Sequence, residues 1–65
     1  MKHWFEFPKP GNCQEFFLEL EFFSPCDYGT IWNSWRIAEV DCPDDRLRLI
    51  KDLAAQYNGK EIPRP

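Results

Sequence analysis

The sequence has few of the residues on which catalytic and phosphate-binding sites are built. It contains one histidine, His3, and three isolated glycines at positions 11, 29 and 59. These glycines cannot form the glycine-rich loop that cradles a phosphate, and a hydrolytic triad needs a histidine beside its nucleophile. The paired acids Glu19 and Glu21 would need a deep cleft to shift one carboxyl pKa, and a small domain offers little depth. We therefore expect no catalytic residues, no cofactor and no enzymatic activity, with His3 at the surface of a strand end.

Cysteines are also few, and long apolar runs are missing. Cys13, Cys26 and Cys42 are odd in number and irregularly spaced, which argues against a secreted disulfide framework. With His3 they could supply four zinc ligands, but no Cys-x₂₋₄-Cys pair is present, so buried apolar thiols are favoured. No window approaches the ~20 apolar residues that span a membrane, and the first residues do not look like a signal peptide. We expect a cytoplasmic protein with reduced thiols and no metal.

Aromatic and acidic residues are abundant instead. Phe, Trp and Tyr make up 17% of the 65 residues, and each can bury roughly 150–250 Å². The net charge is −3, but residues 13–45 hold eight acids against Arg36 alone, whereas residues 46–65 are mildly basic. A small aromatic core and an acidic central segment that attracts basic partners are therefore expected.

Hydrophobic periodicity predicts three strands, at 3–7, 14–23 and 30–40. The segment 14–23 alternates, with Phe16, Leu18, Leu20 and Phe22 on one face, so we expect it to be the central strand of the sheet. In the segment 3–7, His3 shares one face with two phenylalanines. The segment 30–40 alternates less cleanly, and a bulge near residues 33–34 would reconcile its two phases.

A helix is predicted over residues 43–58. Asp41 can cap it, Pro43 suits its first turn, and Gly59 suits the left-handed residue that follows a helix. Its apolar stripe has helical spacing and comprises Leu47, Ile50, Leu53, Ala54 and Tyr57. An extended tail at 60–65 completes a single α+β domain, a three-stranded antiparallel β-meander with one C-terminal amphipathic α-helix packed on one face.

One helix would leave the other sheet face open, and aromatic anchors rimmed by acids are typical of a protein interface. The residues expected to bind a partner there are Trp4, Glu6, Phe17, Glu19, Glu21, Phe23 and Trp32. We expect a non-enzymatic protein-binding module or inhibitor whose partner protein has a basic surface. An accessory protein of a phage or mobile element that antagonises a nucleic-acid-handling protein would fit this description. Two alternatives stay open. One is nucleic-acid binding through the sheet or through Arg46, Arg48 and Lys51, which the acids disfavour; the other is a homodimer that buries the open face.

Overall fold

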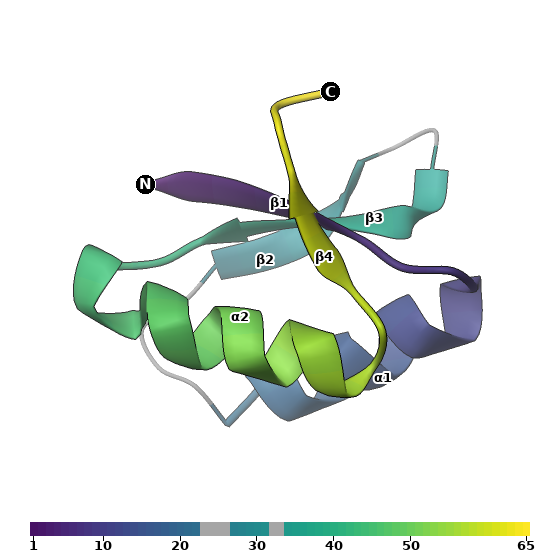
Figure 1. Ribbon diagram of the computed structural model, residues 1–65, viewed down its shortest axis with the longest axis horizontal. Coiled ribbons are helices and arrows are strands. Elements are labelled where there is room, and N and C mark those ends of the chain that lie inside the picture. Colours follow the sequence, from purple (N-terminus) through teal and green to yellow (C-terminus); the bar gives the residue numbers. More distant parts are fainter. Residues whose placement is uncertain (23–26, 32–33) are drawn as a thin grey trace.

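The chain folds into a sheet with two helices on one of its sides. The computed structural model describes residues 1–22, 27–31 and 34–65. The elements, in order, are β1 (Lys2–Glu6), α1 (Pro10–Leu20), β2 (Asp27–Ile31), β3 (Ser34–Asp41), the 3₁₀ turn η1 (Asp44–Arg46), α2 (Leu47–Gln56) and β4 (Lys60–Ile62). The four strands are antiparallel in the spatial order β2-β3-β1-β4. Both helices cover the same face, and the opposite face carries no helix of the described chain (Figure 1).

The coarse prediction of an α+β fold with an antiparallel sheet is confirmed, but the number of elements is wrong. β1 corresponds to the first predicted strand, and Phe5 in it and Phe7 directly after it are buried, as the alternation indicated. The predicted strand 30–40 corresponds to the end of β2 together with β3, which pair with each other. The bulge expected near residues 33–34 falls partly outside the described residues; a register shift is found between Thr30 and Ile31.

The segment predicted as the central strand, 14–23, is not a strand: residues 14–20 belong to helix α1, residues 21–22 form the turn after it, and residue 23 lies outside the described residues. Pro10 occupies the first turn, where its missing N–H is not needed. Cys13, Phe16 and Leu20 are fully buried, a spacing of three and four residues that only a helix brings to one face. Leu18 and Phe22, expected in the core, are exposed. The run contains both periods, and packing against the sheet selects the helical one.

The core lies between the sheet and the helices. Its centre is an aromatic cluster in which the Phe16 ring lies 5.1 Å from Phe7 and 5.9 Å from Phe5. Ile50, Leu53 and Ala54 of α2 close the layer. The predicted stripe of the second helix is therefore confirmed, and Leu47 and Tyr57 pack against the core from its two ends.

The two ends of α2 differ from their predicted caps. The Asp41 carboxylate does not cap the helix, because it accepts a hydrogen bond of 2.9 Å from the N-terminal ammonium of Met1. At the other end the left-handed residue is Asn58, with φ 64°, and not Gly59. The Asn58 and Gly59 N–H groups donate to the carbonyls of Ala55 and Ala54, which is a Schellman ending with asparagine at C′.

Candidate functional site

The residues predicted to bind a partner do not form one surface. Trp4 and Glu6 lie on the open sheet face, but Glu19 belongs to α1 and Glu21 follows it directly, in the other layer of the molecule. Phe17 is half-buried and its ring stacks on Tyr28 at 5.3 Å. The predictions for Phe23 and Trp32 fall outside the described residues. The predicted acidic sheet face is therefore wrong, because it depended on a strand that is a helix.

On the open sheet face, Glu39 interacts with both Trp4 and Lys2. The Trp4 indole N–H donates a hydrogen bond of 3.1 Å to the Glu39 carboxylate, which Lys2 also approaches at 3.6 Å. The Arg64 guanidinium lies 6.0 Å from the centre of the Trp4 ring. Acids and bases are interleaved here, so this face presents no field of one sign.

The acidic, apolar surface of the molecule is the outward side of α1. We call Glu15, Leu18, Glu19 and Phe22 the α1 stripe. The first three are spaced i, i+3 and i+4 and share one side of the helix, and Phe22 lies in the turn that follows its last residue, Leu20. Leu18 is 54% exposed and Phe22 84% exposed. This spacing of apolar anchors is the one by which amphipathic helices contact partner proteins.

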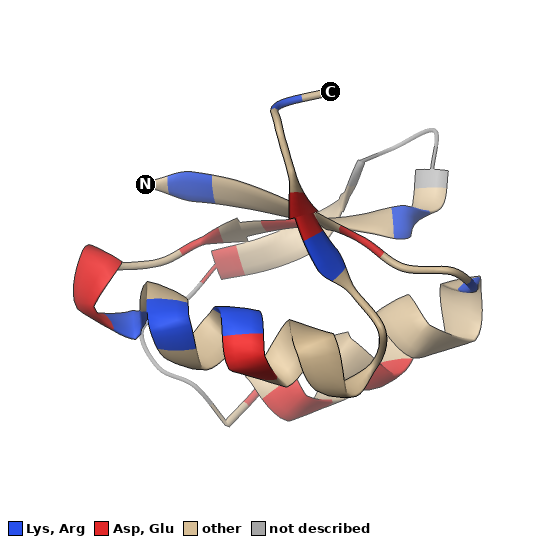
Figure 2. Ribbon diagram, viewed as in Figure 1, with Lys and Arg blue, Asp and Glu red and all other residues tan. Residues whose placement is uncertain are grey.

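The charges on α1 lie where they cost stability. Glu15 and Glu19 repel each other at i, i+4, and Glu19 and Glu21 lie at the negative C-terminal end of the helix dipole. The helix contains no Lys or Arg to offset them (Figure 2). Glu19 and Glu15 also act on Tyr57, directly after α2. Burial raises the pKa of the Tyr57 hydroxyl, and the negative charges of these two carboxylates raise it further.

A shallow groove of about 380 Å³ lies between α1 and the β2–β3 pair. Its walls are mostly apolar, and Trp35, 71% exposed, stands at one side of it. The lining residues are Pro10, Cys13, Gln14, Phe17, Thr30 and Trp35. The stacked pair of Phe17 and Tyr28 lies next to this groove, because Phe17 belongs to both.

The sheet has two edges of different character. β4, at one edge, is three residues long, begins with Lys60 and is followed by Pro63 and Pro65. Short strands, lysine and proline prevent an edge from pairing with another chain. β2, at the other edge, is five residues long and contains neither proline nor a basic residue.

His3 is buried, so the expectation of a surface histidine is wrong. Its Nδ1 lies 2.9 Å from a carboxylate oxygen of Glu61, whose other oxygen contacts the Lys51 ammonium at 3.0 Å. Hydrogen bonds from Lys51 and then from His3 lower the pKa of Glu61. The alternation of residues 3–7, with His3 on the side of Phe5 and Phe7, contained the signal for this burial.

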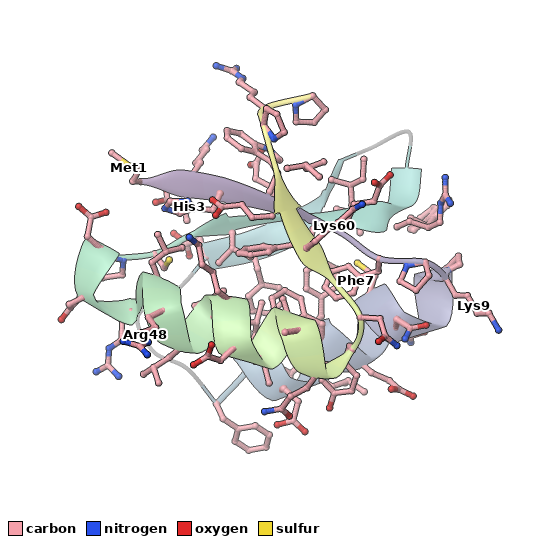
Figure 3. The ribbon with its side chains drawn as sticks, in the orientation of Figure 1. Met1, His3, Phe7, Lys9, Arg48 and Lys60 are labelled. Atoms are coloured by element: carbon pink, nitrogen blue, oxygen red, sulfur yellow. The ribbon has the colours of Figure 1, made fainter. Side chains whose placement is uncertain are left out.

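The cysteines and the basic helix flank provide little for a ligand. Cys13 and Cys42 are buried, as expected of apolar thiols, and burial raises the pKa of Cys13 to about 11; Cys26 lies outside the described residues. In the described part of the chain, no three His, Cys, Asp or Glu side chains are grouped to hold a metal ion. Of the expected nucleic-acid-binding residues, Lys51 is paired with Glu61, and Arg48 points away from the sheet (Figure 3).

No helix in the described residues has the length and apolar character needed to cross a membrane. Comparison of the chain with protein-family models, with curated proteins and with solved structures finds no match.

Proposed function

We propose that the protein is a non-enzymatic protein-binding module that presents the α1 stripe to a basic partner protein. The observation that carries this proposal is the placement of the α1 acids. Sequences that specify one fold tend to avoid unfavourable local charges, and exceptions concentrate at functional sites. Here a helix without Lys or Arg carries its carboxylates beside two exposed apolar side chains, Leu18 in the helix and Phe22 in the turn after it.

A basic partner would relieve this arrangement. Cations on the partner would offset the repulsion between Glu15 and Glu19 and complement the helix C-terminus. Leu18 and Phe22 would supply the apolar contact, since exposed apolar residues inside a charged rim are typical of a protein interface. An antagonist of a nucleic-acid-handling protein fits this chemistry, because such proteins carry basic surfaces. Nucleic acid itself would be repelled by the same acids.

The test is capture of partners from a bacterial lysate by the immobilised protein and by two charge-reversal variants. Glu19→Lys with Glu21→Lys changes the α1 surface. Asp45→Lys with Asp52→Lys makes the same change in net charge at exposed positions of η1 and α2. We expect the first variant to lose the partners that the wild-type protein and the second variant both retain.

Stability distinguishes loss of binding from loss of folding. Replacing the α1 acids by lysine removes a like-charge pair and reverses an unfavourable dipole interaction. The free energy of unfolding should therefore rise by about 0.5–1.5 kcal/mol, measured by urea denaturation. A variant that is more stable and yet binds nothing supports a functional role of Glu19 and Glu21. Capture of the same partners by both variants would refute the proposal.

A further inference from the structure

We propose that the free edge of β2, with the groove between β2 and α1, binds an extended basic segment of the partner protein as a fifth strand of the sheet. This inference rests on the proposed function and specifies how the partner is held. An extended peptide that joins a sheet edge gains affinity from main-chain hydrogen bonds, and alternate side chains enter the neighbouring pocket.

The backbone of β2 is available for such pairing. In the described residues β2 pairs with β3 alone. Its side chains Asp27, Tyr28 and Thr30 are all exposed. The opposite edge of the sheet is protected by Lys60 and the prolines of the tail, whereas β2 has neither device. The register shift between Thr30 and Ile31 is at the end of β2, so residues 27–30 keep a regular register. Of the two edges, β2 is therefore the one on which a strand can form.

The groove lies where side chains of the added strand would point. Tyr28 and Thr30 pair with Val40 and Ala38, which are buried, so they lie on the helix side of the sheet. A strand about 4.8 Å beyond β2 would alternate in the same way. Its helix-side residues would meet the stacked rings of Phe17 and Tyr28 at the rim of the groove. Every second residue of the ligand should therefore be apolar.

Charge selects a basic segment over a second copy of this chain. The lining of the groove is uncharged, which suits apolar side chains of a ligand strand. The charge is on the other side of this edge, where β2 carries Asp27 and no Lys or Arg, and Asp27 lies opposite Asp41 of β3. Pairing of β2 with the β2 of a second copy would bring two acidic α1 helices together on one side of a joined sheet, and their like charges would oppose it. A ligand strand with basic residues on its outer side would instead meet Asp27, which lies on the open side of β2 opposite Asp41.

The experiment uses a defined peptide, a heptamer that alternates Lys and Val, titrated into the full-length ¹⁵N-labelled protein. We expect alternate backbone amides of β2 to become protected from hydrogen exchange, and the binding to weaken as salt is added. The same peptide N-methylated at every second residue, so that one edge cannot donate, should bind at least about tenfold more weakly because two or more hydrogen bonds are lost. Trp35→Ala, which removes an exposed side chain of the groove, should also weaken binding of the peptide. Asp45→Lys, at an exposed position that does not line the groove, is the control and should still show protection of the β2 amides.

Three results would overturn the inference. The first is equal binding of the methylated peptide. The second is peptide binding that shifts only amides of the α1 stripe, in which case the proposed function stands and strand addition fails. The third is protection of the β2 amides without peptide, together with a dimeric mass in ultracentrifugation, since a second copy would then occupy the edge. Failure of the proposed function is detected separately, by the retention of captured partners in the α1 charge-reversal variant.

Discussion

Gly59 lies against a buried ring, and replacing it by alanine should destabilise the fold strongly. A Cβ atom at position 59 would lie 2.7 Å from Cζ and 2.8 Å from Cδ1 of Phe7, and it would also clash with Cε1 of the same ring. The ring cannot retreat, because Phe7 is 1% exposed and its centre lies 5.1 Å from that of Phe16, which is 0% exposed. Figure 3 shows Phe7 between the sheet and the helices, beside the segment that joins α2 to β4.

Overpacking of this kind typically costs about 1–3 kcal/mol. For a chain of 65 residues, an unfolding entropy of about 2.1 cal/mol/K per residue means that each kcal/mol lowers Tm by about 7 °C. Gly59→Ala should therefore lower Tm by roughly 7–20 °C in a thermal melt followed by circular dichroism. Gly11→Ala is the control: its Cβ would meet nothing within 4 Å and it lies in α1, so Tm should stay the same or rise.

A second background identifies the cause. If the clash with Phe7 is responsible, Gly59→Ala should cost much less in a Phe7→Leu variant, where the ring is absent, and the double-mutant cycle should give a coupling of at least about 1 kcal/mol. If glycine were instead needed for backbone freedom, the cost would be the same in both backgrounds. The left-handed φ at Asn58 leaves no such need at Gly59. An unchanged Tm in Gly59→Ala, or equal costs in the two backgrounds, would refute the steric argument.

Two further predictions concern buried or paired ionisable groups. Hydrogen bonds from Lys51 and His3 lower the pKa of Glu61, so its carboxylate stabilises the folded protein above its unfolded pKa of about 4.5, and this stabilisation is lost as pH falls through the folded value. Glu61→Gln should therefore reduce the fall in the free energy of unfolding below about pH 5, measured by urea denaturation. An unchanged pH dependence would contradict this. Burial raises the pKa of Cys13 to about 11, so less of the reactive thiolate is present in the folded protein. At pH 8, iodoacetamide should therefore alkylate Cys13 roughly a hundredfold more slowly in the folded protein than in the protein unfolded in urea, as measured by peptide mass spectrometry. Equal rates in the two conditions would contradict this.

The parts of the fold that the sequence predicts well each contain one clear period. In β1 the alternation is regular, and Phe5 and Phe7 face the core as expected. In α2 the spacing of Ile50, Leu53 and Ala54 fits a helix and no strand, and all three are buried. In both segments the local pattern and the packing agree, so no tertiary information was needed to assign them.

The α1 segment contains two periods, and this explains the main error. Phe16, Leu18, Leu20 and Phe22 alternate as in a strand, but Cys13, Phe16 and Leu20 are also spaced as in a helix. The predicted strand begins at residue 14, so Cys13, the first member of the helical stripe, lies outside it. The choice between the two periods depends on which surface the segment packs against, and much of that surface is formed by β2, β3 and α2, which all come later in the chain. β4 was missed for a related reason, since three residues carry too little pattern to indicate a strand.

The change of segment 14–20 from predicted strand to helix also changes where the candidate site is proposed. As a strand, the segment would have placed Phe17, Glu19 and Glu21 beside Trp4 on one open face. As a helix, it turns Phe17 toward β2, where the ring stacks on Tyr28, and leaves Glu15 and Glu19 exposed on another side of the helix, near Tyr57. The proposal of a basic partner does not depend on this error, because it rests on an acidic segment with few cations, which is a property of the sequence in either conformation. What the structure adds is a reason to expect main-chain recognition, because helix α1 and the edge strand β2 frame a groove that an open sheet face would not have.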